Sequence, residues 1–144
     1  MITFERAIII NRPPQEIFDY VADPANANKW QSQMVSVEWT SEGPPGVGSR
    51  QRAVSRFLGR DIDVISEFTV WDPPNQHSFK VVDGPFQVEA TMKFEAEESG
   101  TKVTMSGQSE LSAFFRLAEG LIKKQMERQF DTNLEALKLL LEEG

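Results

Sequence analysis

Cysteine is absent from this chain of 144 residues, and histidine and tyrosine each occur once. Without cysteine the protein has no disulfide, no thiolate nucleophile and no Cys-ligated metal, a composition that fits a reducing compartment. The single histidine, His77, finds no second histidine or cysteine for a catalytic triad or a usual zinc set. It follows a polar turn, so we expect it at the surface. We also expect no metal and no organic cofactor.

Basic blocks and long apolar runs are missing as well. The formal net charge is -7, which opposes binding to nucleic acid, because that affinity comes largely from Lys and Arg displacing counterions. No stretch approaches the ~20 apolar residues of a membrane span. The start of the chain, residues 1–6, carries charge where a signal peptide has its apolar run. We therefore expect no nucleic-acid partner, no integral membrane association and a cytoplasmic location.

Strand and helix signals open the chain in a clear order. Residues Ile2–Ile10 are rich in β-branched side chains, which predicts a strand that ends before two prolines. Pro13 and Pro14 suit the first turn of a helix, where a missing N–H would be unpaired in any case. Asp23 followed by proline repeats this signal and predicts a second short helix over residues 24–30. One strand and two small helices therefore come first.

The middle of the chain alternates apolar and polar residues with a period of two. In one segment the apolar positions are Phe86, Val88, Ala90, Met92 and Phe94, with polar residues between them. Turn sequences divide residues 34–111 into six such strands. Most of these strands are too closely spaced for the helical crossovers that parallel pairing needs. We predict an antiparallel meander with one dry and one wet face.

The last thirty residues predict one long amphipathic helix. After Ser112 proline is absent and glycine occurs only at Gly120 before the final residue. The apolar residues that recur at helical spacing are Leu117, Leu121, Met126, Phe130, Leu134, Leu137 and Leu141. Such a stripe has to be buried, and the dry face of the meander is the large apolar surface left for it. The predicted fold is α+β, in one domain spanning 1–144. A curved seven-stranded antiparallel sheet, in the order β-α-α-β6-α, wraps around the C-terminal helix.

Four phrases carry a family resemblance: PPQEIFDYVADP at 13–24, KW at 29–30, GVGSR at 46–50 and GTKVT at 100–104. Together with the order of elements they resemble the START-like superfamily, also called SRPBCC, and in particular its polyketide cyclase/dehydrase type. The resemblance covers nearly the whole chain and implies the helix-grip fold. Members of this superfamily bind lipids, hormones and polyketides, assist chaperones, or cyclise polyketide chains.

We expect a ligand cavity between the sheet and the C-terminal helix, because inward residues of mixed size prevent tight closure. Small residues, Ala90, Gly107 and Ser109, lie beside large ones on the predicted dry face. The predicted ligand-binding residues, with the first two near the mouth, are Trp30, Met34, Val64, Phe68, Phe79, Phe86, Val88, Ala90, Met92, Met105, Gly107, Ser109, Phe114, Leu117, Leu121 and Gln125. Plain core packing is the alternative interpretation for each of them, since methionines and aromatics serve cores too.

The arginines of the third strand leave two registers open. If Arg52 and Arg56 point inward, a guanidinium could hold a carboxylate or enolate oxygen of a ligand. The other register puts Ala53 and Phe57 inside, and we favour it because an unpaired buried charge is costly. Arg52, Arg56 and Glu67 are therefore only weak catalytic candidates.

The sequence is consistent with three functions. The first is binding of a hydrophobic or amphipathic small molecule (lipid, polyketide-like or isoprenoid-like) without a reaction. The alternative is a polyketide aromatase/cyclase-type enzyme, with Arg52 or Arg56 stabilising an enolate while Glu67 or water moves protons. The last is a chaperone-like or quinone-chaperoning interaction protein. The expected partner is thus a hydrophobic small molecule, and a weak homodimer stays open.

Overall fold

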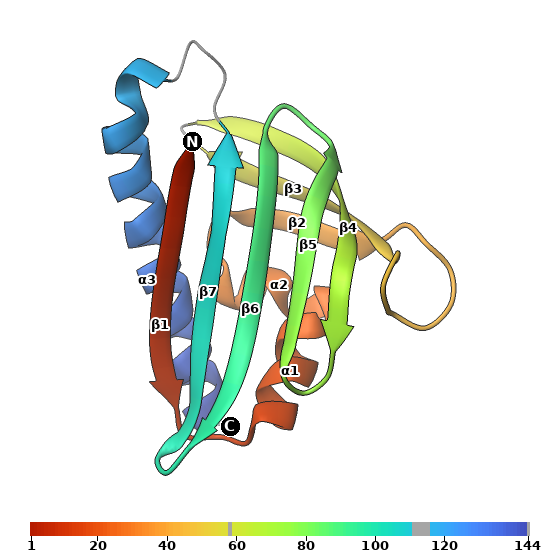
Figure 1. Cartoon of the computed structure of the whole chain (residues 1–144), viewed down its shortest axis with the longest axis vertical. Helices are drawn as coiled ribbons and strands as arrows, with labels where there is room; N and C mark the ends of the chain where they lie inside the picture. The colour runs from red at the N-terminus through yellow and green to blue at the C-terminus, as the bar shows by residue number, and fades with distance from the viewer. Residues whose placement is uncertain (58, 111–115, 144) are drawn as a thin grey trace.

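The computed structural model describes residues 1–57, 59–110 and 116–143 and shows a curved sheet with a long helix beside it (Figure 1). The elements in chain order are β1 (Ile2–Ile10), α1 (Pro14–Ala22), the 3₁₀ helix η1 (Pro24–Asn26), α2 (Ala27–Trp30), β2 (Met34–Trp39), β3 (Arg50–Phe57), β4 (Arg60–Asp72), β5 (Gln76–Asp83), β6 (Gln87–Glu97), β7 (Gly100–Glu110), η2 (Arg116–Ala118) and α3 (Glu119–Glu143). The predicted order of one strand, two small helices, six strands and a long helix is confirmed.

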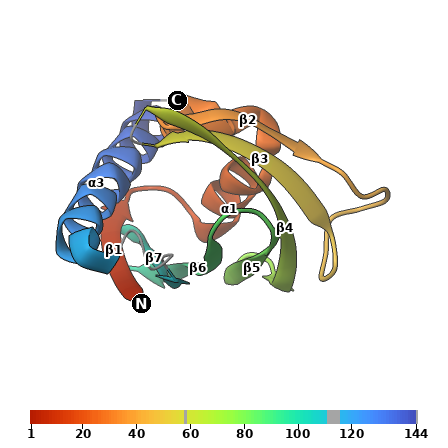
Figure 2. The same ribbon diagram turned by 90° about the horizontal axis from the view of Figure 1, so that it is seen from above.

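All neighbouring strands pair antiparallel, in the sheet order β1-β7-β6-β5-β4-β3-β2. Figure 2, which looks down on the molecule from above, shows the sheet curling so far that β2 and β3 lie across from β6 and β7. Helix α3 lies beside β1, and α1 lies inside the curl at its lower end (Figures 1 and 2). The sheet therefore forms a half-barrel whose concave face looks toward the helices.

Local sequence signals explain the two small helices. Pro13 precedes α1 in an extended conformation and Pro14 occupies its first turn, which an α-helix tolerates because those N–H groups have no intrahelical partner. Asp23 ends α1 and caps the next turn, where its Oδ1 atom accepts a hydrogen bond of 3.0 Å from the backbone N–H of Ala25. These signals set where α1 begins and ends and where the next helical turn starts.

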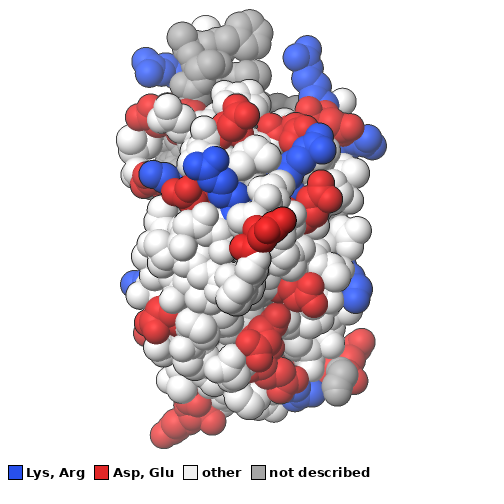
Figure 3. Space-filling model, turned by 90° about the vertical axis from the view of Figure 1, so that its right-hand side faces the viewer, with Lys and Arg blue, Asp and Glu red and all other residues white. Residues whose placement is uncertain are grey.

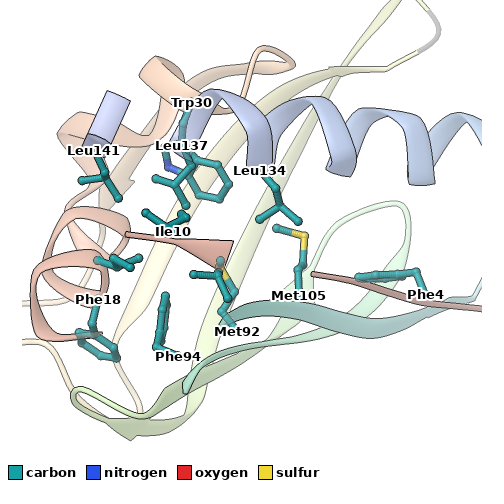
Figure 4. Packing of buried hydrophobic residues seen from close by; sticks show 12 residues of the cluster. Phe4, Ile10, Phe18, Trp30, Met92, Phe94, Met105, Leu134, Leu137 and Leu141 are labelled. Carbon is teal, nitrogen blue, oxygen red and sulfur yellow. The ribbon is translucent and has the colours of Figure 1, made fainter. Parts of the chain in front are cut away.

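The lower half of the half-barrel is filled by a continuous apolar core. Leu134, Leu137 and Leu141 of α3 are buried and point toward the concave face (Figure 4). Their buried partners in the same cluster come from β1, α1, α2, β6 and β7: Phe4, Ile10, Ile17, Phe18, Trp30, Met92, Phe94, Val103 and Met105. Burial of such side chains is the main favourable contribution to folding.

The apolar stripe of α3 begins later than the sequence pattern indicated. Leu117 is fully exposed and Leu121 is 72% exposed, whereas Ile122 is buried. One residue rotates a helix by about 100°, so Ile122 and Leu121 cannot share the buried face. Leu117 lies in the short turn η2 before α3 begins. The prediction that Leu117 and Leu121 face the sheet is wrong, and the stripe starts at Ile122.

A buried polar network fixes the middle of α3 to the segment between α2 and β2. Asn133 is 1% exposed, and its Nδ2 atom donates to Oε1 of Gln33 at 2.9 Å. Gln129 Nε2 donates to Oδ1 of Asn133 at 3.0 Å and to Oγ of Ser32 at 2.8 Å. Because a buried amide needs such partners, the network specifies one position of the helix along the sheet.

Charged side chains hold the same helix to the edge strand β1. Arg6 donates from Nε to Oδ1 of Asp131 at 2.7 Å and from Nη2 to Oδ2 at 2.6 Å. Lys138 donates from Nζ to the backbone carbonyl of Ile9 at 2.7 Å and to Oε2 of Glu142 at the same distance. These contacts cover the edge of β1, which would otherwise be open to pairing with another chain.

Truncating the core contact of α3 should destabilise the protein strongly. Leu137 is 0% exposed, whereas Leu139 of the same helix is 59% exposed. We expect Leu137→Ala to lower the free energy of unfolding by about 2–5 kcal/mol, through lost burial and the cavity left behind. Urea unfolding followed by tryptophan emission measures this change in the free energy of unfolding. Leu139→Ala is the matched control and should change stability little; equal effects of the two variants would contradict this placement of α3.

Candidate ligand-binding site

The register of the sheet brings inward residues of five strands into straight rows across the concave face. Phe68 of β4 pairs with Phe79 of β5, which pairs with Ala90 of β6, then Gly107 of β7 and Phe4 of β1. This middle row joins residues far apart in the sequence. It forms an apolar surface that faces the helices, because directly opposed residues point to the same side of a sheet.

The next row toward the lower end is sealed. Trp71, His77, Met92 and Met105 are in register there, and the last three are all less than 10% exposed. Arg6 ends the row on β1, opposite Met105, and its guanidinium turns to α3 as described above. This part of the concave face is core and is closed to a ligand.

His77 lies in this sealed row and not at the surface, so that prediction is wrong. It is 5% exposed, and its ring is surrounded by the aromatic rings of Phe18, Phe68, Trp71 and Phe94 at centroid distances of 5.4, 5.6, 5.9 and 5.8 Å. Neither ring nitrogen has a hydrogen-bond partner among the described residues. Burial lowers the pKa of His77 from 6.5 to about 4, because a charged ring cannot be solvated there.

Four half-buried apolar residues of the concave face lie on β5 and β6 above the sealed row. Phe79 and Val81 of β5 and Val88 and Ala90 of β6 point inward yet are only half-buried. By contrast, Phe4 and Ile2, which are the inward residues of β1 in the same rows, are buried. In these rows solvent therefore still reaches apolar side chains of β5 and β6, whereas those of β1 are covered.

The structure brings together most of the predicted ligand-binding residues, at different depths. Val64, Phe68, Phe79, Val88, Ala90, Met92, Met105, Gly107 and Ser109 share the concave face. Phe68, Met92, Met105 and Ser109 are buried there, and the others are half-buried. Gly107 is covered: a Cβ atom on it would lie 2.8 Å from Cζ of Phe4. A glycine at this position thus lets the Phe4 ring lie close to the sheet, and it opens no space.

The remaining predicted residues lie elsewhere. Trp30 was expected near the mouth, but it is 3% exposed and belongs to the lower core. Met34 and Phe86 are half-buried, at the start of β2 and just before β6. Gln125 and Leu121 are exposed on α3 and Leu117 is exposed in η2, so none of these three faces an enclosed interior. Phe114 lies outside the described residues.

Two inward residues of β5 were missed by the sequence analysis. Val81 and His77 alternate with Gln76, Ser78 and Lys80, and this period of two would have placed both on the inner face together with Phe79. The signal was present, but it starts directly after a turn, where the first residue of a strand is hard to identify.

The arginines of β3 point outward, in the register that the sequence analysis favoured. Arg52 donates to Oδ1 of Asp63 at 3.0 Å, and Arg56 Nε lies 3.0 Å from Oδ1 of Asp61. Glu67 faces Arg50 on the same convex side, at 3.1 Å. The bond to Arg52 is the main cause that lowers the pKa of Asp63. Arg52 and Arg56 are thus exposed, Glu67 is half-buried, and all three take part in ion pairs on the convex side, away from the concave face.

The surface charge, the groups that could bind a metal and the apolar character of the helices indicate no further kind of site among the described residues. On the side of the molecule seen in Figure 3, acidic and basic side chains are interspersed and form no continuous basic area. Within residues 1–57, 59–110 and 116–143, no three His, Cys, Asp or Glu side chains cluster so that they could hold a metal ion. Among the described helices, none combines the length and the apolar character that crossing a bilayer requires.

The half-barrel around a long terminal helix, with its inner face apolar, is the helix-grip fold of START-like proteins. A family profile described as "Polyketide cyclase / dehydrase and lipid transport" matches residues 1–142, and the chain belongs to this family. Family and fold fit a protein that binds a hydrophobic ligand or acts as a polyketide cyclase.

Solved structures with the same fold are numerous. The protein TTHA0849 from Thermus thermophilus is 24% identical and superposes with a TM-score of 0.84, covering 95% of this chain and 94% of that one. Ara h 8.0201 is 17% identical with a TM-score of 0.72 over 99% of both chains. The di-domain ARO/CYC BexL from the BE-7585A biosynthetic pathway is 21% identical, with a TM-score of 0.77 over 99% of this chain and 47% of BexL. The comparison with curated proteins finds no match.

The buried histidine should make stability depend on pH. Its pKa is lowered to about 4 in the folded protein, so the unfolded chain takes up the proton first as the pH falls. The folded state therefore loses up to about 3 kcal/mol between pH 6.5 and pH 4. We expect His77→Phe, which keeps an aromatic ring in the cluster, to remove this part of the acid sensitivity.

The measurement is urea unfolding of both proteins at several values between pH 7 and pH 4. Each protein is compared with itself, so a general loss of stability in the variant does not affect the result. Carboxyl groups with a lowered pKa, such as Asp63 and Glu142, contribute equally to both. Identical slopes of unfolding free energy against pH would show that His77 is not held neutral by burial.

Proposed function

We propose that this protein binds an apolar or amphipathic small molecule between the upper part of its sheet and α3. One observation carries the proposal: Phe79, Val81, Val88 and Ala90 form an inward-facing apolar surface that is left half-buried above a sealed core. Exposed apolar area on an inner face is unfavourable in water, and a ligand that covers it gains that free energy.

The filled lower half of the half-barrel supports the same site. The core that includes Phe94, Met92 and Leu137 leaves the lower rows closed, so a guest has the upper rows as its contact surface. The polar network at Asn133 and the Arg6–Asp131 contact hold the middle of α3 in one place. A preformed surface of this kind avoids part of the entropy lost when a flexible site orders around its ligand.

The cyclase alternative receives less support from the geometry. Its weak catalytic candidates, Arg52, Arg56 and Glu67, lie on the convex side in surface ion pairs. The one histidine of the chain lies below the proposed site in the sealed row. Binding without a reaction is therefore the function that we put first.

Filling the proposed site should abolish binding of an apolar molecule. The neutral dye N-phenyl-1-naphthylamine, whose emission rises in apolar surroundings, serves as the ligand in a fluorescence titration. Ala90 is small, half-buried and central in the middle row. Ala90→Trp adds a large side chain where the dye would lie. We expect the dissociation constant of the dye to be about tenfold or more higher for this variant than for the native protein.

The control is the same substitution on the opposite face. Ala7 is exposed on β1 and lies with Lys93 and Thr104 in a depression of the convex side. Ala7→Trp should leave the affinity unchanged. If Ala7→Trp weakens binding and Ala90→Trp does not, the dye binds the convex depression; if the native protein binds no dye, the proposed function is wrong.

The arginines of β3 separate binding from cyclase chemistry. Both side chains are exposed, and surface ion pairs contribute little. We expect Arg52→Ala and Arg56→Ala to leave the dye affinity within about a factor of two of the native value. A poly-β-ketone substrate whose turnover falls sharply in either variant, with unchanged unfolding, would instead establish the enzymatic alternative.

A further inference from the structure

The sheet opens between β5 and β6 at its upper end. Backbone pairing of these strands runs from Gln76 opposite Lys93 to Lys80 opposite Glu89, and it stops there. Both strands continue, however, β5 to Asp83 and β6 back to Gln87. In Figure 1 their ribbons diverge toward the loop that joins them.

The unpaired ends are held apart by their other neighbours. Val81 pairs with Ser66 of β4 after an irregularity in the β4–β5 register, and Val88 pairs with Ser109 of β7. If the β5–β6 register simply continued, Val81 would lie opposite Val88. Each strand instead follows the sheet on its own side, so the seam between them lacks the hydrogen bonds that close a sheet.

A depression of about 440 Å³, counted with the solvent inside it, lies at this seam. Its lining residues are Met1, Lys80, Val81, Gln87, Val88, Glu89, Gln108 and Glu110. Lys80, Glu89 and Gln108 belong to the convex face, where Gln108 Nε2 donates to Oε2 of Glu89 at 3.3 Å. Val81 and Val88 belong to the concave face. One depression is thus lined from both sides of the sheet.

A second depression of the sheet is lined by residues of one face only. It is lined by Glu5, Ala7, Lys93, Glu95, Lys102, Thr104 and Ser106, which are opposed to one another on the convex face of β1, β7 and β6. There the ladders are continuous and no inward residue takes part. Of these two depressions, only the one at the β5–β6 seam has residues of the concave face in its lining.

We propose that this seam is the opening through which the ligand reaches the concave face. The inference rests on the binding function proposed above and names its route. Val81 and Val88 lead directly to Phe79 and Ala90, the half-buried apolar residues of the site. The apolar body of an amphipathic ligand lies on these four residues, and its polar head stays outside at Lys80.

The charges at the rim favour one class of head group. The lining of the depression has one lysine, Lys80, and two glutamates, Glu89 and Glu110. The amino group of Met1 is already paired with Glu119 at 3.2 Å. The rim therefore has an excess of negative charge, which repels an anionic head. The opening suits an amphipath whose head is uncharged or cationic and forms hydrogen bonds.

A cross-link tests the route, since the chain has no cysteine of its own. Val81→Cys combined with Val88→Cys places one thiol on each side of the seam, and oxidation joins the two when the strands come within disulfide reach. Stopped-flow fluorescence then gives the association and dissociation rates of N-phenyl-1-naphthylamine. We expect both rates to fall about tenfold or more in the oxidised form, compared with the reduced form of the same variant, and to recover on reduction.

The matched control joins the same strands where they are already paired. Ser78 and Thr91 are opposed in the ladder, and their hydroxyl oxygens lie 2.7 Å apart. A disulfide between Ser78→Cys and Thr91→Cys should leave both rates unchanged. Dye that binds with equal rates in the oxidised and reduced Val81→Cys/Val88→Cys protein would overturn the opening, whereas absence of dye binding to the native protein would overturn the binding function itself.

A single substitution decides the question if the thiols do not join. Val88→Trp puts a bulky side chain on the inner side of the seam, while Val82→Trp puts one on an exposed position of β5. We expect slower uptake of the dye only for Val88→Trp. Equal uptake rates in the two variants would contradict the proposed route.

The head-group preference has its own test. Replacing both rim carboxylates, by Glu89→Gln and Glu110→Gln, should speed the association of the anionic dye 8-anilinonaphthalene-1-sulfonate at low salt and leave the neutral dye unaffected. Glu97→Gln with Glu98→Gln is the control pair, exposed at the lower turn between β6 and β7. An anionic dye that associates no faster after removal of the rim charges would overturn the preference.

Discussion

The contact on which this structure depends is the packing of α3 into the lower half of the curved sheet. Leu134, Leu137 and Leu141 bury the apolar side of the helix against strands from both ends of the chain. The sheet alone has an unprotected inner face and an open edge at β1, and the helix covers both. Because this contact fills one end of the half-barrel completely, any binding surface has to lie at the other end.

Polar contacts then fix where the helix lies along that surface. An apolar stripe can slide, since dispersion and hydrophobic burial have little directionality. The amide of Asn133 and the carboxylate of Asp131 prevent such sliding, because each is hydrogen-bonded to one partner outside the helix, Gln33 and Arg6 respectively. The distance between the upper sheet and α3 is thus set by groups that lie outside the proposed site. The apolar residues of the site are therefore not needed to position the helix and can contact a ligand.

Much of the fold could be predicted from local patterns. The alternation along β6 placed Val88, Ala90 and Met92 on one face, and the cost of burying unpaired charge placed the arginines of β3 outside. Where such a pattern meets an element end, prediction failed. His77 was expected at the surface after a turn, although it is the buried second residue of β5. Leu121 was assigned to the helix stripe, although Ile122 occupies it. A shift of one residue reverses the face of a strand and rotates a helix by about 100°.

By itself the sequence determined which elements form, in which order, and which side of each is apolar, because periodicity and turn residues act over a few neighbouring positions. The tertiary structure alone decided how deep each inward residue lies and where the sheet stays open. Depth depends on what the curled sheet brings opposite, as with the rings around His77. The seam between Val81 and Val88 depends on the neighbours that each strand follows, β4 on one side and β7 on the other. These are relations between segments far apart in the chain, and no local pattern contains them.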